Sequence, residues 1–275
     1  MLRRRKKLFG GARFNPLVYS PALWLDASDQ STLFQDRTGA SASTPVASNA
    51  DPAGTWKDKS GNARHVTAGS DSTRPTYTTN KQNGLPMLVS DGVDDTLFVD
   101  SATWFGSATN ITVFGVVKPA AAAAADSNTF AMMLNCQNGG TGTQWVNYLG
   151  GSSTGSLSGE KFAPFFNSNG RRTGIGAAYV RPANTAEVWT GTFGTSGMKV
   201  YQNGNELTVD LFSTGDATTA CGPASVTIST PRLYIGSTGQ PFVCGEVLVF
   251  TSTLSTAQRQ QVERYLGNKW GIAVP

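Results

Sequence analysis

The sequence predicts an all-β protein, an antiparallel two-sheet jelly-roll sandwich with one C-terminal helix and an extended basic arm at the N-terminus. The 275 residues include 31 glycines and only 15% charged side chains, a composition typical of β-proteins with many turns. Short apolar runs alternate with turn residues, and the one convincing helical pattern comes last. With 39% hydrophobic residues, the chain can build one large core.

The first strand is predicted in the apolar stretch ALWLDASD, residues 22–29. A polar loop without periodicity follows at 36–54, and a tight turn is centred on residues 60–62. The segment 84–100 predicts two short strands on either side of a tight turn at Asp91-Gly92, because an Asp-Gly pair favours such turns.

The middle of the chain begins with a strong strand pattern and then loses it. Residues 110–119 form a continuous apolar run with β-branched side chains, which indicates a strand in a sandwich interior. Residues 129–136 predict another core strand. The weakly patterned segment 137–178 is expected to contain strands near 145–149 and 162–166. Six alanines at 120–125 fit a helical turn and a loop tip equally well.

The last third predicts a hairpin and two further strands. Asn203-Gly204 lies inside MKVYQNGNELTV, residues 198–209, and is the strongest two-residue hairpin signal because both positions need positive φ. Strands are also predicted at 231–237 and 241–250.

The predicted helix begins after Ser255, a good N-cap, with Gln258 three residues later to complete a capping box. Val262, Tyr265, Leu266 and Lys269 share one face, with Lys269 extending its charge outward. Gly267 or Asn268 is expected to end the helix, which would have about three turns and lie against the sheet edge.

The N-terminal arm, residues 1–20, differs in charge from the domain that follows at 21–275. It holds six of the 22 basic residues and no acidic one, so the rest of the chain has 16 basic and 18 acidic side chains. A basic nucleic-acid-binding surface on the body is therefore not indicated. A secretory signal is not expected, because Leu8 and Phe9 are followed at once by Gly10-Gly11 and no apolar stretch of about 7–15 residues exists.

Four segments resemble a known family: ALWLDASD, WKDKSGNARH, RPTY followed by NGLPMLVSDGVDDTL, and GEVLVFTSTLSTAQRQQVERYLGNKWGI. Together they look like the laminin-G-like, concanavalin-A-like lectin–glucanase sandwich modules, which are frequent in virion proteins of tailed bacteriophages and in bacterial surface proteins. The resemblance covers residues 20–273, with no matching motif at about 120–195. It implies a two-sheet jelly roll, but it does not imply a single function.

The inventory of reactive side chains argues against an enzyme. His65 is the only histidine, and its turn context is typical of surface packing. A glycosidase of this fold would need closely spaced carboxylates on one strand, yet no two of the five glutamates lie within ten residues, and Glu246 has no acidic neighbour in its strand. We expect no catalytic residue and no cofactor. Three cysteines give no disulfide framework, although Cys221 and Cys244 leave one pair possible.

The sequence contains two kinds of candidate binding residue: acidic side chains that could bind a metal ion, and tryptophans that could stack on sugars. The acidic cluster of Asp91, Asp94 and Asp95 offers carboxylates that suit Ca²⁺, but a turn in which Asp91 accepts bonds from backbone amides is the favoured interpretation, and no metal is expected. Asp58 is expected to hold its own turn in the same way.

Three tryptophans beside loops are candidates for stacking on sugars, each with burial as the alternative: Trp56, Trp104 and Trp145.

The leading functional hypothesis is a structural virion protein of a tailed bacteriophage, assembled in the host cytoplasm without a signal peptide. Capsid decoration or a compact head- or tail-fibre component suits its size. The expected partners are the major capsid protein or tail components, with a homo-oligomer such as a trimer. A host glycan is a possible ligand, nucleic acid a disfavoured one, and no membrane partner is expected. The alternative is a carbohydrate-binding adhesin or receptor-binding module with no structural role.

In the leading hypothesis the arm is an anchor that contacts a neighbouring virion subunit. Arginine suits pairing with carboxylates through its bidentate geometry, and apolar side chains would enter pockets of the partner. The alternatives are contact with packaged nucleic acid and a solubilising tail. The anchoring residues are predicted to be Arg3, Arg4, Arg5, Lys6, Lys7, Leu8, Phe9, Arg13 and Phe14.

Overall fold

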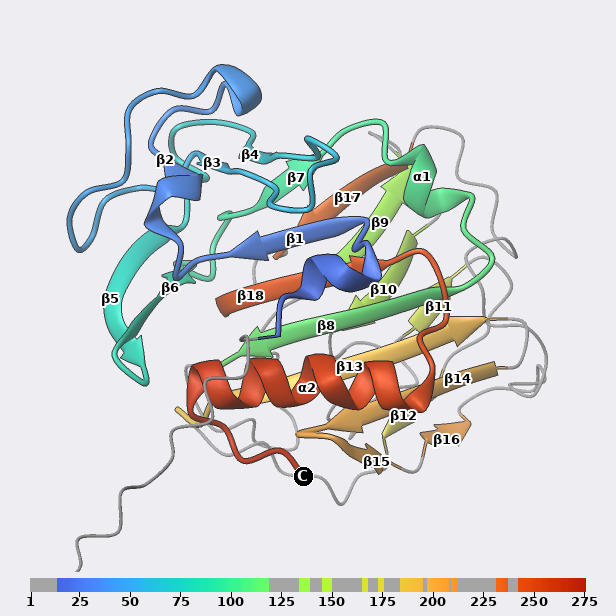
Figure 1. Cartoon of the computed structure of the whole chain (residues 1–275). Helices are drawn as coiled ribbons and strands as arrows, with labels where there is room; N and C mark the ends of the chain where they lie inside the picture. The colour runs from blue at the N-terminus through green and yellow to red at the C-terminus, as the bar shows by residue number, and fades with distance from the viewer. Residues whose placement is uncertain are drawn as a thin grey trace, which may run out of the picture.

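Two antiparallel sheets form the protein, and a C-terminal helix lies across the outer face of one of them (Figure 1). This computed structural model confirms the predicted all-β sandwich with one long C-terminal helix. The structure describes residues 14–118, 134–138, 145–149, 165–167, 173–175, 184–194, 197–207, 209–211, 231–236 and 242–275.

The first sheet, sheet A, has the strand order β15-β14-β13-β8-β18-β6-β5, and β1 also pairs with β18. Strand β1 therefore lies beside the last strand of the chain, in antiparallel register. The strands of sheet A are β1 (Leu23–Asp26), β5 (Thr76–Gln82), β6 (Leu85–Val89), β8 (Ile111–Val117), β13 (Glu187–Gly194), β14 (Gly197–Gln202), β15 (Asn205–Leu207) and β18 (Val243–Phe250).

The second sheet, sheet B, has the order β11-β10-β9-β17-β7-β4-β3-β2, and β12 (Thr173–Ile175) pairs separately with β16 (Val209–Leu211). The strands of sheet B are β2 (Leu33–Phe34), β3 (Thr55–Trp56), β4 (Val66–Ala68), β7 (Leu97–Val99), β9 (Leu134–Asn138), β10 (Trp145–Leu149), β11 (Phe165–Asn167) and β17 (Pro231–Ile235). The described helices are the short η1 (Pro16–Tyr19), η2 (Gln30–Thr32), η3 (Gly39–Ser41) and α1 (Thr103–Gly106), and the long α2 (Thr256–Trp270).

The central strands of sheet A are buried on both faces, which explains their continuous apolar runs. Every residue of β8 and β18 is buried. One face packs against sheet B in a core that includes Trp189 and Phe193, and the other packs under α2, where Phe114, Leu248 and Leu266 meet. A strand that faces water on one side would alternate apolar and polar residues, so α2 is what allows the uninterrupted pattern.

The predicted strands mostly agree with the structure, with one difference in connection. The hairpin turn at Asn203-Gly204 is confirmed, with φ of 48° and 82°. Segment 84–100 does form two strands, but they do not make a hairpin: β6 belongs to sheet A and β7 to sheet B. The Asp91-Gly92 turn therefore carries the chain from one sheet to the other.

Helix α2 begins as predicted and ends later. Ser255 accepts a bond from the Gln258 amide, and the Gln258 side chain accepts one from the Ser255 amide, so the capping box is confirmed. The helix continues through the predicted stop to Trp270, and Gly271 with φ 67° is the left-handed cap. It lies across β8 and β13 and not at the sheet edge.

The start of the described chain corrects the predicted limit of the arm. Residues 14–20 belong to the folded body: η1 is capped by Asn15, and the Phe14 ring lies 5.9 Å from that of Tyr265 in α2. The half-buried Phe14 therefore packs against α2 as part of the body. The other predicted anchor residues, the alanines at 120–125 and Cys221 lie outside the described residues. Among the helices of the described residues, none has the length and apolarity needed to cross a membrane.

Candidate ligand-binding pocket

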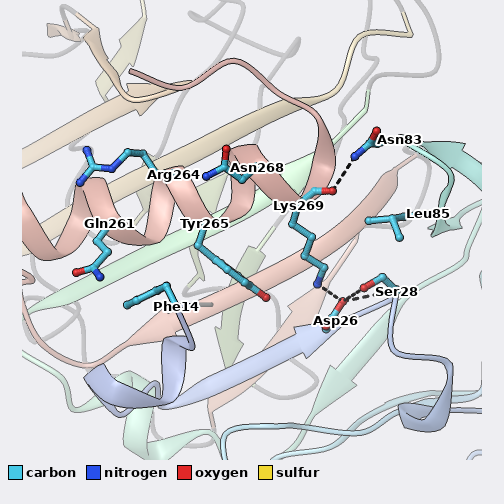
Figure 2. Close-up of a pocket in the computed structure, with 10 residues that line it drawn as sticks. All are labelled: Phe14, Asp26, Ser28, Asn83, Leu85, Gln261, Arg264, Tyr265, Asn268 and Lys269. Carbon is cyan, nitrogen blue, oxygen red and sulfur yellow. Dashed lines mark hydrogen bonds and ion pairs between the residues drawn. The ribbon is translucent and has the colours of Figure 1, made fainter. Parts of the chain in front are cut away.

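A pocket of about 880 Å³ opens between α2, the end of β1 and the turn that joins β5 to β6 (Figure 2). Its volume is within the range of small-molecule sites. The residues that line it are Phe14, Asp26, Ser28, Asn83, Leu85, Gln261, Arg264, Tyr265, Asn268 and Lys269.

Helical periodicity brings one set of these side chains to a single side of α2. Gln261, Tyr265 and Lys269 are spaced four residues apart, so they follow one another along the side that faces β1. Asn83 holds the end of the helix, because its side-chain amide donates to the Lys269 carbonyl at 3.0 Å. The helix and the β5–β6 turn are thus fixed relative to each other.

A pair of carboxylates forms the base of this region. Asp26 and Glu246 are directly paired in the register of β1 and β18, and both are buried. The Lys269 ammonium donates to both, at 2.7 Å to each carboxylate. One lysine from the helix therefore joins two strands of sheet A.

Every oxygen of this carboxylate pair accepts a hydrogen bond from the protein. Glu246 accepts from the indole N–H groups of Trp24 and Trp270, each at 2.8 Å, and from the Tyr265 hydroxyl at 2.9 Å. Asp26 also accepts from Lys59 at 2.8 Å, and Lys59 makes a second ion pair with Asp29. The oxygens of Asp26 and Glu246 therefore find all of these hydrogen-bond donors within the protein itself.

The two carboxylates differ in acidity. Burial alone would raise the pKa of Asp26, but the ion pairs with Lys269 and Lys59 outweigh burial and lower it. Burial raises the pKa of Glu246, and the adjacent charge of Asp26 raises it further. Burial also raises the pKa of the Tyr265 phenol, so this hydroxyl acts as a hydrogen-bond donor and not as a phenolate nucleophile.

One sequence-based expectation is wrong at this point. Lys269 does not extend into solvent, because its ammonium turns inward to the carboxylates. Glu246 has no acidic neighbour within β18, as expected, but Asp26 lies opposite it in β1. Nothing local in the sequence gives the register between strands more than 200 residues apart, so neither contact had a sequence signal.

The groups that remain open to a ligand are on the helix and at the rim. Gln261 accepts a bond from the Tyr19 hydroxyl through Oε1, which leaves its amide N–H groups facing solvent. Arg264 and Asn268 are exposed and lie side by side on α2. Phe14 and Tyr265 supply ring surface on the same side of α2 as Gln261 (Figure 2). The pocket can therefore form hydrogen bonds and apolar contacts with a ligand. Its carboxylate, Asp26, already accepts hydrogen bonds from Lys59 and Lys269.

Two of the predicted sugar-stacking tryptophans, Trp56 and Trp104, do not line this pocket. Trp56 is fully buried in β3, so it cannot stack on a ligand, and the alternative of burial is the correct one. Trp104 in α1 is half-buried and has the Arg64 guanidinium over its ring at 4.0 Å. Trp145 lies in β10, and its side chain is outside the described residues.

His65 and Asp58 hold a loop against β1. The His65 Nδ1 accepts the Asp58 backbone N–H at 3.0 Å. Asp58 Oδ1 accepts from the Ser60 amide at 2.8 Å, which confirms the predicted turn, and from the Trp24 amide at 3.0 Å. Burial lowers the pKa of His65. Both side chains thus secure the first strand.

The acidic cluster at the β6–β7 connection forms the predicted turn. Asp91 accepts a bond from the Val93 amide at 2.8 Å, and Asp95 accepts one from the Asp91 amide at 2.8 Å. Carboxylate oxygens of Asp91, Asp94 and Asp95 lie within 4.8 Å of one another. Burial raises the pKa of Asp95 to about 6; the bond from the Asp91 amide opposes this rise, and the charges of Asp91 and Asp94 add to it.

Replacing Asp95 by asparagine is expected to stabilise the protein at pH 8 by about 1–3 kcal/mol. The folded pKa of Asp95 is about 6 and its ordinary value is 3.8, so the folded state binds more protons between these values and stability falls as pH rises through them. Asparagine keeps an acceptor for the Asp91 amide and removes the charge. Thermal unfolding at pH 4 and pH 8 measures the difference.

Thermal unfolding in the presence of EDTA distinguishes a metal-free turn at these aspartates from a cation-binding site. Chelation is expected to shift the unfolding temperature by less than a few degrees. A large drop, together with destabilisation by Asp95→Asn, would show that a bound cation offsets the repulsion among these carboxylates.

The fold and the pocket define an all-β sandwich with a helix-covered sheet and a surface cavity of mixed polar and apolar lining. No protein-family model and no curated protein matches the chain. Among solved structures, it is similar to the Trypanosoma rangeli sialidase at 13% identity and a TM-score of 0.46, over 91% of this chain and 33% of that one.

It is also similar to the ligand-binding domain of botulinum neurotoxin serotype D in complex with N-acetylneuraminic acid, at 12% identity and a TM-score of 0.47, over 91% of this chain and 52% of that one. This chain thus spans from a third to about half of these proteins.

Proposed function

We propose that the protein is a carbohydrate-binding sandwich module and that the pocket beside α2 is its binding site. The observation that carries the proposal is the pocket itself, a cavity of about 880 Å³ with amide side chains and two aromatic rings along its walls. Sugars present hydroxyl groups and an apolar ring face, so they need both kinds of contact in one site.

The charged network beneath the pocket supports this function by holding the site in shape. Lys269 is held by Asp26 and Glu246, and Asn83 fixes the end of the helix. The binding groups are therefore ordered before a ligand arrives, which lowers the entropic cost of binding. Because the carboxylates are saturated, we propose binding without bond cleavage.

A glycan array probed with the full-length protein tests the proposal. We expect specific binding that is reduced at least tenfold by the double variant Gln261→Ala/Asn268→Ala. Both side chains are exposed, so the fold should be retained. Asn205→Ala, an exposed residue of β15 far along the chain from α2, is the matched control and should leave binding unchanged. Absence of binding to any glycan, or equal binding by the double variant, would overturn the proposal.

We also propose that the module is a structural component of a tailed-bacteriophage virion, attached through its basic N-terminal segment. The family resemblance and the six basic residues of the first 13 positions support this role. A further support is the exposure of Leu17 and Val18 in η1, which are 42% and 64% exposed next to that segment. Exposed apolar side chains beside a charged segment suit a protein interface better than a nucleic-acid one.

Deleting residues 1–13 tests this attachment in an assembly reaction with particles. The truncated protein should stay folded and fail to enter particles, and attachment of the full chain should weaken with salt. Val18→Ser should also weaken incorporation, whereas Val93→Ser, a change at an equally exposed valine elsewhere, should not. Normal incorporation of the truncated protein excludes the anchor, and loss of attachment on nuclease treatment would favour packaged nucleic acid.

A further inference from the structure

The ionic network beneath the pocket contains more carboxylates than cations. Its members are Asp26, Asp29 and Glu246 on the acidic side and Lys59 and Lys269 on the basic side. The exposed guanidinium of Arg264 lies on the other side of α2 from the rings of Phe14 and Tyr265 (Figure 2). The side of the pocket with the aromatic rings therefore does not favour an anionic ligand over a neutral one.

Lys269 supplies one further hydrogen-bond donor on the side of the rings. An ammonium group has three N–H donors, and Lys269 gives one to Asp26 and one to Glu246, each at 2.7 Å. Its side chain is 19% exposed and lines the pocket. The third N–H can therefore bind an acceptor of the ligand, such as a carbonyl oxygen. A cationic ligand is disfavoured here, because like charges would meet at this ammonium.

The β5–β6 turn adds an acceptor and an aliphatic side chain. Asn83 is exposed, and its amide nitrogen donates to the Lys269 carbonyl, so its oxygen Oδ1 can accept a bond from a ligand. Leu85, two residues later, is half-buried and also lines the pocket. The pocket thus offers a donor, an acceptor and an apolar surface between the end of β1 and this turn (Figure 2).

From these groups we infer that the ligand is a neutral N-acetylhexosamine residue of a glycan. Its acetamido group carries a carbonyl oxygen, an N–H and a methyl group, which match the third N–H of Lys269, the Oδ1 of Asn83 and the side chain of Leu85. The sugar ring packs against Tyr265, and its hydroxyls accept bonds from the amide of Gln261. This inference rests on the proposed carbohydrate-binding function and narrows it to glycans with N-acetylated sugars.

Sugars that differ at one substituent test the inference. The methyl β-glycosides of N-acetylglucosamine and N-acetylgalactosamine are compared with those of glucose and galactose, which carry a hydroxyl in place of the acetamido group. We expect the full-length protein to bind at least one N-acetylated glycoside about tenfold more tightly than its parent in an NMR titration. Methyl β-glucosaminide, which carries an ammonium at the same position, should gain nothing over the glucoside.

Two substitutions at the β5–β6 turn should reduce this preference. Leu85→Ala removes the contact with the methyl group. Asn83→Gly removes the acceptor and suits the backbone, which has φ 50° at this position. Val89→Ala is the matched control, because Val89 is half-buried in the same strand and packs on the same apolar cluster as Leu85 but does not line the pocket. The ratio of the two affinities is the readout, since a loosened site would weaken binding of both sugars alike.

The possible outcomes separate the ligand class from the function. Equal binding of each N-acetylated glycoside and its parent would overturn the N-acetylhexosamine ligand while leaving carbohydrate binding in place. A preference that survives both Leu85→Ala and Asn83→Gly, or an equal gain with the glucosaminide, would have the same consequence. Failure of all these sugars and of every array glycan to bind would overturn the proposed function as well.

Discussion

Lys269→Ala is expected to lower the free energy of unfolding by about 3–5 kcal/mol, because it removes one partner of a buried ion network. Glu246 is fully buried, and Lys269 is the cation bonded to it. Asp26 retains Lys59, so the uncompensated charge falls mainly on Glu246. Urea denaturation at pH 7 measures the loss.

The variant should also acquire a characteristic dependence on pH. Without Lys269 the pKa of Glu246, already raised by burial, rises further above its unfolded value. Stability is then greater at low pH, where the group is protonated, and decreases as pH rises through the folded pKa. Lys269→Ala should therefore regain part of the loss at pH 5.

Two comparisons make this result interpretable. Lys199→Ala removes an exposed ion pair with Glu206 and should cost less than about 1 kcal/mol. Lys269→Met combined with Glu246→Gln should be more stable than Lys269→Ala, because the buried charge is gone. A loss in Lys269→Ala no larger than in Lys199→Ala would contradict the network as a source of stability.

Trp270→Ala is expected to cost about 3–5 kcal/mol, as truncations of large buried aromatic residues do. The Trp270 side chain is fully buried between α2 and sheet A. Its ring lies so close to β18 that a Cβ on Gly245 would be 2.6 Å from Cη2. Alanine leaves both a cavity and a Glu246 oxygen without its indole donor. Thermal and urea unfolding both report the change.

Trp270→Phe separates these two contributions, because it keeps most of the ring and loses the N–H donor. We expect a cost of about 1–3 kcal/mol from the lost indole bond to Glu246 Oε2, which keeps its bond from Lys269, on top of a small packing loss. If Trp270→Ala unfolds at the wild-type temperature, α2 is an appendage and its packing on sheet A does not stabilise the fold.

Local signals in the sequence were sufficient for the elements that they directly encode. The apolar run of 110–119 predicted β8, Asn203-Gly204 predicted its hairpin, and Ser255 with Gln258 predicted the start of α2. In each case the residues that produce the structure are neighbours in the chain, so a pattern of a few positions contains the physical cause.

Contacts between distant segments could not be predicted in this way. The pairing of Asp26 with Glu246 depends on strand register, and the inward turn of Lys269 depends on that pairing. Trp56 beside a loop gave no sign of its complete burial. Consequently strands with a strong local pattern were predicted, whereas β5, β13 and the pocket, which is assembled from four separate segments, were not.

The pairing of β1 with β18 has a consequence for the way the chain folds as it is made. Asp26 and Lys269 are 243 positions apart, and synthesis at about 5–20 residues per second separates their appearance by about 10–50 seconds. Throughout that interval the apolar β1 lacks its strand partner, and β8 lacks the helix that covers it. The sandwich therefore closes only after β18 and α2 have been synthesised, its many long-range contacts make closure slow, and chaperones have their longest opportunity to bind at the first strand.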